Sequence, residues 1–313
     1  MVTLDDIRAA ADGLSGVAHR TPTERSETFT RLCGGEVWLK FENQQRTGSF
    51  KIRGAYTKIQ SLSPDERAAG VVAPSAGNHA QAVAFAARSA GVDATVYMPE
   101  AASLAKVGAT EGYGATVRLV GDSVEGSVEA ARRAVHDEGR TLVHPFDDEV
   151  VIAGQGTVGL EILEDAPDAD VVVVPVGGGG LVAGIATAVA PRGVRVVGVE
   201  PDRSAALLPA LEAGKPVPVT PSTIAGGLDA PYTAPNALAA CQAAGVQVVT
   251  VPDEAIADAM RRLYAEAKLA CEPAGAAGVA AVLSGLVEGA SVVAVVSGGN
   301  VGPDIASGIL IGR

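Results

Sequence analysis

The chain has 313 residues, 48% of them hydrophobic, and its 24 Lys and Arg against 36 Asp and Glu give a net charge of −12. This length allows a core shared between two lobes, and the acidic balance argues against nucleic acid or an anionic membrane as main partner. Three distant cysteines, an acidic start without a signal-peptide pattern and the lack of a long apolar segment predict a cytoplasmic protein without disulfides.

Strand and helix patterns alternate along the chain. An amphipathic helix is predicted over 3–14, a strand over 37–42 and a helix from residue 51 to about 61. Further strands are predicted over 71–73, 94–98, 116–120, 141–143, 171–174, 194–199, 246–251 and 291–296. The helices between the first of these are predicted over 78–90, 101–113 and 123–138. Such alternation is typical of βαβ units, and the valine runs of the later strands are typical of parallel strands covered on both faces.

The first candidate for chemistry is Lys51, which opens a helical pattern. A lysine on a solvated helix face usually has charged residues three or four positions away. The neighbours of Lys51 at these spacings are instead Thr47, Gly48, Gly54 and Ala55. Small neighbours leave room for a flat ligand, and burial would lower the pKa of the amine towards that of a usable nucleophile. An ordinary half-buried lysine is the alternative interpretation.

A turn of small residues, 74–81, joins a predicted strand to a predicted helix. Backbone N–H groups at such a helix start can bind a carboxylate or a phosphate. A hydrolase nucleophile at Ser75 is a rival interpretation, but Ala73 stands where the first glycine of G-x-S-x-G is required. A tight turn that only caps the helix is the structural alternative.

Four consecutive glycines, 177–180, follow the valine strand and open another helix, which is typical of a phosphate cradle. The same stretch fits G-x-G-x-x-A, and Glu200 ends the next strand where a dinucleotide fold has its ribose-binding acid. A nicotinamide enzyme is therefore an alternative. A second formal match, 154–159, lacks the acidic residue and is interpreted as chance. Two further small-residue turns, 272–277 and 297–300, indicate packing when each is considered by itself.

The chain resembles the fold-type II pyridoxal-phosphate enzymes in the order of four segments. These are Ser49-Phe50-Lys51, the turn 75–79, the four glycines and the turn 297–300. Within that group the chain looks most like the serine/threonine dehydratase and serine racemase branch, over essentially its whole length. The resemblance implies an α/β fold of two lobes, each with a mainly parallel sheet flanked by helices. We expect residues 1–65 and 145–313 to form a large cofactor-binding domain and residues 66–144 a small inserted domain.

The resemblance also implies roles for individual residues. Lys51 would bind pyridoxal 5'-phosphate as a Schiff base and move the α-proton, while Asn78 would hydrogen-bond the ring hydroxyl. Phe50 would pack on the ring, and Ser297 would meet the pyridine nitrogen. The cofactor phosphate would be bound by Gly177, Gly178, Gly179, Gly180 and Leu181. The substrate would be bound by Ser75, Ala76, Gly77, Asn78, His79 and Gly227.

The expected contact of Ser297 and three departures from the family pattern narrow the expected reaction. A neutral Ser297 hydroxyl cannot keep a proton on the ring nitrogen as a carboxylate would, which favours β-elimination over long-lived carbanions. Racemases of the branch have a serine, as acid and base, where this chain has Ala76. Glu200 matches the first ligand of a divalent-metal site, but Ala206 replaces the next acidic ligand, so no metal is predicted. Gly226 stands where an aspartate is usual, which leaves the identity of the substrate open.

The sequence therefore predicts a pyridoxal-phosphate-dependent ammonia-lyase that dehydrates a small β-hydroxy amino acid, L-threonine or L-serine, to a 2-oxo acid and ammonia. The alternatives are a 3-hydroxyaspartate dehydratase, a serine racemase, an NAD-dependent dehydrogenase and a sensor that binds the cofactor without turnover. The expected partner is a small amino-acid substrate, and the expected assembly is a homodimer or a larger homo-oligomer.

Overall fold

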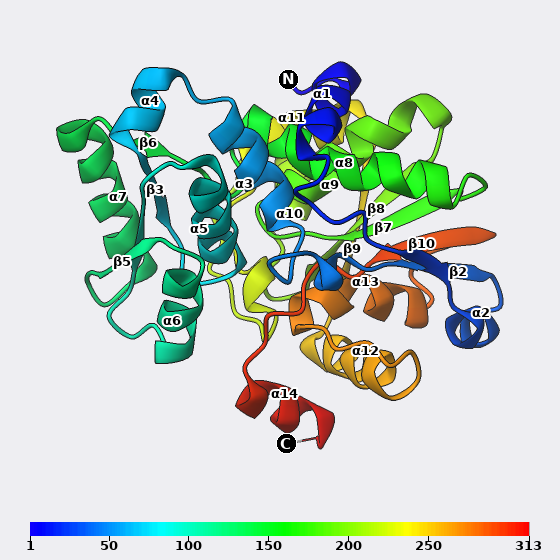
Figure 1. Cartoon of the computed structure of the whole chain (residues 1–313). Helices are drawn as coiled ribbons and strands as arrows, with labels where there is room; N and C mark the ends of the chain where they lie inside the picture. Colours follow the sequence, from blue (N-terminus) through cyan, green and yellow to red (C-terminus); the bar gives the residue numbers. More distant parts are fainter. Residues whose placement is uncertain (313) are drawn as a thin grey trace.

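The computed structural model describes residues 1–312, in which two sheets form two lobes (Figure 1). The larger sheet has six strands in the order β1-β2-β10-β7-β8-β9, and all neighbours are parallel except the antiparallel pair of β1 and β2. Its strands are β1 (Thr23–Arg25), β2 (Glu36–Lys40), β7 (Val171–Pro175), β8 (Arg195–Pro201), β9 (Gln247–Val251) and β10 (Ser291–Val295).

Helices cover both faces of the larger sheet because its valines alternate between two cores. Val172 and Val174 pack in one core, whereas Val171 and Val173 pack in the other. The first core is covered by α1 (Leu4–Leu14), α8 (Glu149–Asp165), α9 (Gly180–Val189), α10 (Leu207–Ala213) and α11 (Pro235–Ala243). The second is covered by α2 (Glu27–Cys33), α12 (Asp253–Ala265) and α13 (Pro273–Leu283), with α14 (Pro303–Leu310) against α12. Short 3₁₀ turns lie at Glu42–Gln44, Ala190–Arg192 and Gly226–Leu228.

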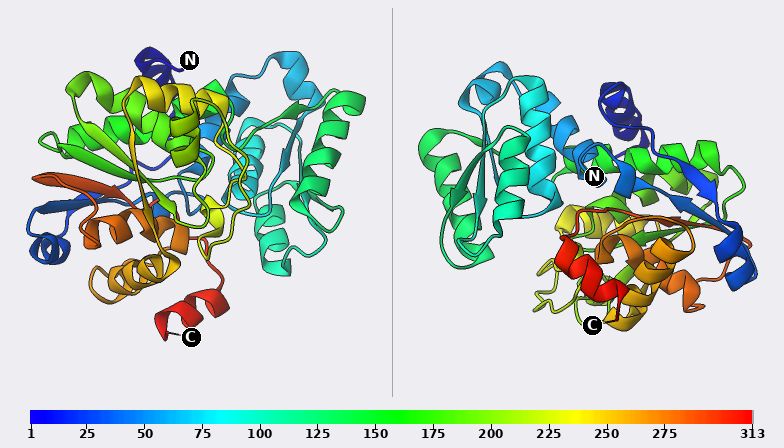
Figure 2. Two further views of the ribbon diagram at one scale, coloured as in Figure 1. Left: turned by 180° about the vertical axis from the view of Figure 1, so that it is seen from behind. Right: turned by 60° about the horizontal axis from the view of Figure 1, so that its bottom comes forward.

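The smaller sheet has four parallel strands in the order β5-β4-β3-β6. They are β3 (Val71–Pro74), β4 (Ala94–Met98), β5 (Thr116–Leu119) and β6 (Thr141–Leu142). The helices of this lobe are α4 (Pro64–Ala69), α5 (Asn78–Ala90), α6 (Leu104–Gly112) and α7 (Val124–Glu138). Helices α5 and α7 cover opposite faces of the sheet, as the two views of Figure 2 also show.

Helix α3 (Lys51–Gln60) lies between the lobes and packs against both α5 and α8. Ile52, Ala55 and Ile59 are fully buried in the core of the smaller lobe. On the side of α8, Gly54 and Gly154 approach so closely that a Cβ built on Gly154 would lie 2.7 Å from the Gly54 Cα. The helix that begins at Lys51 is therefore held by both lobes, although the predicted division assigns it to the large one.

The predicted strands agree with the structure to within one or two residues at each end. Helix α8 was not predicted, because it is buried between α1, α3 and α9 and so lacks the apolar stripe of a surface helix. The formal dinucleotide match 154–159 lies inside α8, so it forms no strand-to-helix turn. Within residues 1–312, none of the helices combines the length and the apolar character needed to cross a bilayer.

Candidate active site

Lys51 is the first residue of α3 and points into the molecule. Its Nζ donates a hydrogen bond to the Pro145 carbonyl at 2.7 Å and lies 5.1 Å from the centroid of the Phe50 ring. Burial lowers the pKa of the amine to about 8, although the negative charge of Glu272 opposes this shift. About a tenth of the amine is therefore deprotonated at pH 7, far more than for an ordinary lysine, and a nucleophile or a base requires the deprotonated form.

The four glycines form the turn from β7 into α9. Gly179 has a left-handed φ of 93°, and Gly180 is the first residue of α9. A Cβ at Gly178 would collide with the ring of Phe146, and one at Gly177 would lie 3.1 Å from the carbonyl oxygen of Gly227. Pro145 accepts the hydrogen bond of Lys51, and the residue after it, Phe146, packs on Gly178. The segment 145–146 therefore contacts both the amine and the glycine turn.

The turn 75–79 lies at the start of α5. The Ser75 Oγ accepts a hydrogen bond from the backbone N–H of Gly77 at 3.2 Å, and no side chain caps the first turn of the helix. The free N–H groups there can bind an anion. The ring of His79 is anchored to the Val143 carbonyl at 2.7 Å through Nε2, and burial lowers its pKa to about 3. His79 is therefore neutral, while Ala76 packs against the apolar core of this lobe.

Ser297, at the end of β10, lies next to the residues that precede α3. Its side chain is buried, and its carbonyl accepts a hydrogen bond from the backbone N–H of Phe50 at 3.2 Å. The neighbouring Gly298 forms a β-bridge with Ser49. The structure therefore brings together Lys51, Ser297 and the turn around Gly178, which lie more than 100 residues apart in sequence.

Sequence reasoning missed one ionisable residue of this site, Glu272. Its Oε1 accepts a hydrogen bond from the Asn78 Nδ2 at 2.6 Å. The same oxygen packs against Gly298, and a Cβ at that glycine would collide with it. Burial raises the pKa of Glu272 to about 7, while the hydrogen bond from Asn78 opposes the shift. The available signal was a glutamate directly before Pro273, at the start of a helix in a turn already noted for its small residues.

The residues of this site fit pyridoxal phosphate. Within residues 1–312, the Oγ of Ser49, the Nδ1 of His79 and the Oγ1 of Thr233 are buried without a hydrogen-bond partner. Thr233 lies beside the glycine turn, since its Cγ2 is 3.3 Å from a Cβ built on Gly179. Buried polar groups normally have partners, and a polar ligand bound between these elements would supply them. A buried amine, a glycine cradle and unpaired polar groups suit a phosphorylated aldehyde.

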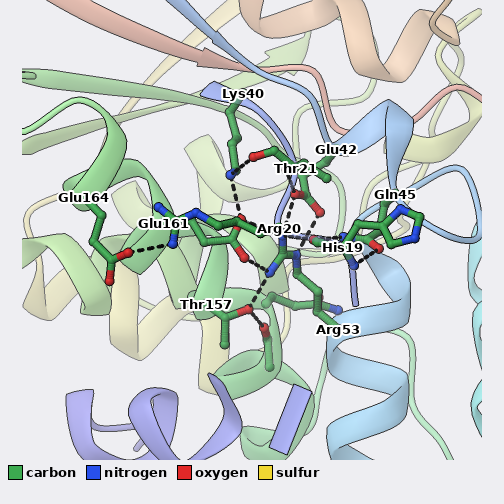
Figure 3. Close-up of polar contacts among 12 residues, drawn as sticks. His19, Arg20, Thr21, Lys40, Glu42, Gln45, Arg53, Thr157, Glu161 and Glu164 are labelled. Atoms are coloured by element: carbon green, nitrogen blue, oxygen red, sulfur yellow. Dashed lines mark hydrogen bonds and ion pairs between the residues drawn. The ribbon is translucent and has the colours of Figure 1, made fainter. Parts of the chain in front are cut away.

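A buried ion network supports α3 through Arg53 (Figure 3). Arg53, only 1% exposed, donates to both carboxylate oxygens of Glu42 at 2.8 and 2.9 Å and to Glu161 at 2.7 Å. Lys40 donates to Glu161 at 2.6 Å and to the Thr21 carbonyl at 2.7 Å. Two cations and two carboxylates thus join β2, the turn Glu42–Gln44, α3 and α8, and Lys40 adds the loop at Thr21.

Glu200 is engaged within the fold. Its carboxylate accepts hydrogen bonds from the backbone N–H groups of Ala206, Leu207 and Leu208, at 2.7, 2.7 and 3.0 Å. The residue is fully buried. Glu200 is therefore not free to bind the ribose hydroxyls of a dinucleotide, which argues against the nicotinamide alternative.

Comparison with known proteins agrees with this site. The family model described as "Pyridoxal-phosphate dependent enzyme" matches residues 14–298. The chain is 47% identical over 305 residues to an L-threonine ammonia-lyase of Thermotoga maritima, covering 96% of this chain and 76% of that protein. It is 41% identical over 307 residues to L-threonine dehydratase catabolic TdcB of Escherichia coli, covering 96% and 93% of the two chains.

Solved structures show the same relationship. Maize serine racemase is similar with a TM-score of 0.93 and 35% identity, covering 97% of this chain and 95% of that one. The threonine deaminase of T.th. has a TM-score of 0.90 and 39% identity, covering 96% and 99%. The predicted fold class and cofactor are confirmed, whereas the roles of individual residues stay predictions. The chain belongs to the family of pyridoxal-phosphate dependent enzymes.

Proposed function

We propose that this chain dehydrates and deaminates a small β-hydroxy amino acid, L-threonine or L-serine, to a 2-oxo acid and ammonia. The observation that carries the proposal is the similarity of 96% of the chain to proteins named L-threonine ammonia-lyase and L-threonine dehydratase, at 47% and 41% identity. Water is lost across the α- and β-carbons, and hydrolysis then releases ammonia, so the atoms balance without a further reactant.

Each part of the site has a place in this reaction. Bound pyridoxal phosphate withdraws electrons from the α-carbon of the substrate. The Lys51 amine, with its lowered pKa, accepts the α-proton. The N–H groups at the start of α9 bind the cofactor phosphate, and those at the start of α5 bind the substrate carboxylate. Ser297 offers the pyridine nitrogen a neutral hydroxyl, and Gly227 lines the space for the substrate side chain.

Racemisation is the main alternative within the family, because serine racemases are among the similar structures. It requires a proton donor on the face of the substrate opposite Lys51. The corresponding turn of this chain has Ala76, whose methyl group carries no exchangeable proton. We therefore expect dehydration to exceed racemisation by a wide margin.

The deciding experiment compares L-threonine, L-serine and the 3-hydroxyaspartate diastereomers for oxo-acid formation by the purified protein loaded with pyridoxal phosphate. We expect L-threonine or L-serine to be the best substrate, and Lys51→Ala to abolish both turnover and the visible cofactor band that borohydride reduction shifts. Lys215→Ala, at an exposed lysine, is the matched control and is expected to behave as wild type.

The same panel identifies the alternatives. If only a 3-hydroxyaspartate yields an oxo acid, that compound is the substrate instead of L-threonine or L-serine. If L-serine yields mainly D-serine, the protein is a racemase. A cofactor band without turnover of any of these amino acids would indicate a sensor.

We also propose a homodimer or larger homo-oligomer in the cytoplasm, with residues 66–144 as the small domain. The compartment is supported by Cys241 and Cys271, whose buried thiols form no disulfide. Light scattering coupled to gel filtration tests the assembly, and a mass of about 31 kDa would contradict it.

A further inference from the structure

Glu272 has no assigned part in this reaction, yet it is the carboxylate of the site. Its backbone is fixed on the turn that carries Ser297, because its N–H donates to the Gly298 carbonyl at 3.1 Å. The residue as a whole is 9% exposed. Gly298 makes room for the carboxylate, since a Cβ built there would collide with Oε1.

The side chain that Glu272 contacts belongs to the other lobe. Asn78, the first residue of α5, donates from Nδ2 to Glu272 at 2.6 Å and accepts at Oδ1 from the Asn300 Nδ2 at 2.8 Å. The same Nδ2 of Asn300 also donates to the Thr47 carbonyl at 2.8 Å. A carboxylate only accepts, so the Asn78 nitrogen must face Glu272. The Asn300 amide donates, so the Asn78 oxygen faces Asn300.

This orientation leaves one hydrogen of the Asn78 amide available. An amide nitrogen carries two hydrogens, and within the described chain one is taken by Glu272. Without the carboxylate, the Asn78 nitrogen would lose its acceptor, and only the Asn300 amide would still hold the side chain, through Oδ1. The second N–H would then no longer be held in one direction towards the ring.

We propose that Glu272 is a positioning residue, whose carboxylate holds the Asn78 amide so that its second N–H is presented to the ring hydroxyl of pyridoxal phosphate. The proposal rests on the proposed function and on the prediction, made from the sequence, that Asn78 is the partner of that hydroxyl. It predicts that Glu272 contributes to binding of the ring through the hydroxyl, and little through the phosphate or the aldehyde.

The test measures binding without turnover, using the cofactor-free protein. The probes are 4'-deoxypyridoxine 5'-phosphate, which lacks the aldehyde, and its 3-O-methyl ether, which also blocks the ring hydroxyl. At about pH 8.5, where Glu272 with its pKa of about 7 is ionised, Glu272→Gln is expected to weaken binding of the first probe about tenfold, the effect of one charge-assisted hydrogen bond. Binding of the methyl ether is expected to change less than twofold. The matched control is Glu254→Gln, at an exposed position of α12.

Further variants separate positioning from a general loss of structure. Asn78→Ala is expected to lose the same selectivity for the free hydroxyl, and adding Glu272→Gln to it is expected to cause no further loss. If Glu272→Gln does not fold, Glu272→Asp keeps the charge but shortens the reach, and the same selective loss is expected. Equal weakening of both probes, or no weakening of either, overturns the proposal. Wild-type protein that binds the probe but converts none of the amino acids contradicts the proposed function alone.

Discussion

At the scale of single residues, the site combines groups that the surrounding fold does not fully stabilise. The amine of Lys51 is buried with one carbonyl partner, and its pKa falls to about 8. Glu272 is buried nearby, and its pKa rises to about 7. Both shifts have burial as their largest cause, which is typical of groups kept for function rather than for stability.

Removal of the lysine is therefore expected to stabilise the cofactor-free protein. Between pH 8 and the ordinary lysine pKa of 10.5, the unfolded chain binds more protons at this residue than the folded chain. The free energy of unfolding hence rises with pH across that window, and the cost of the buried charge is fully present below pH 8.

For Lys51→Met we expect a free energy of unfolding higher by about 1–3 kcal/mol at pH 7, a gain that shrinks towards pH 10. Urea unfolding of the cofactor-free variant at both pH values measures it. Lys215→Met, at an exposed position, is expected to leave the unfolding free energy within about 0.5 kcal/mol of wild type at each pH. A lower free energy of unfolding for Lys51→Met would show that burial of the charged amine does not destabilise the folded chain.

At the scale of elements, α3 is held by the ion network on one side and by glycine contacts with α8 on the other. Arg53, Glu42 and Lys40 are almost completely buried, so each charge depends on its partners. Removing one member leaves an uncompensated charge inside the protein, which costs more than the pair itself contributes.

Arg53→Met is accordingly expected to lower the free energy of unfolding by about 3–5 kcal/mol, and Arg53→Lys by less, because lysine keeps the charge but loses the fork of donors. Arg20→Met is the control, since Arg20 pairs with Glu164 and Asp165 on an exposed surface and is expected to cost at most about 1 kcal/mol. Thermal and urea unfolding of the three variants provide the comparison. Equal costs for Arg53→Met and Arg20→Met would contradict a stabilising role for the network.

The glycines of α8 and α9 provide a second prediction at this scale. A Cβ at Gly184 would lie 2.5 Å from the Ile152 carbonyl and 2.6 Å from the Gly156 nitrogen, and both are backbone atoms that cannot turn aside. Gly184→Ala is expected to lower the unfolding free energy by about 1–3 kcal/mol by overpacking. Gly108→Ala, in α6 with open space around it, is expected to raise it by about 0.5–1 kcal/mol. Urea unfolding measures both changes in the unfolding free energy. A change of the same sign in Gly184→Ala and Gly108→Ala would contradict close packing as the reason for Gly184.

At the scale of the whole molecule, the proposed cofactor site lies between the lobes. The glycine turn follows β7 of the larger sheet, and Lys51 begins α3 between the lobes. Asn78 begins α5 of the smaller lobe. Hydrogen bonds from Asn78 to Glu272 and from Asn300 to Asn78 already connect the two lobes. A ligand bound there contacts both lobes and favours the folded chain as a unit.

Pyridoxal phosphate at 100 times its dissociation constant is therefore expected to raise the free energy of unfolding by about 2.7 kcal/mol. Gly178→Ala is expected to lose most of this gain, because the new methyl group collides with the Phe146 ring at the proposed phosphate site. Gly226→Ala has open space around it and is expected to keep the gain. Melting curves with and without cofactor test the pair, and an unchanged gain in Gly178→Ala would place the phosphate elsewhere.

The sequence by itself determined the alternation of strands and helices and the small-residue turns at the ends of strands. Hydrophobic period, glycine and proline are local signals, so the strands and the candidates around Lys51, Ser75, Gly178 and Ser297 could be found along the chain. Helix α8 could not, because a helix buried on all sides has no amphipathic period. The chance match inside it shows that a glycine pattern acquires meaning only from its place in the fold.

Only the tertiary structure decided which of these residues meet and in what charge state. The hydrogen bond of Glu272 to Asn78 joins positions 194 residues apart, and the neutral state of His79 follows from burial beside Val143. Glu200 looked like a ribose or metal ligand in sequence, but three backbone N–H groups occupy its carboxylate. Burial and pairing are properties of the packed chain, and they set the pKa values and hydrogen bonds on which the chemistry depends.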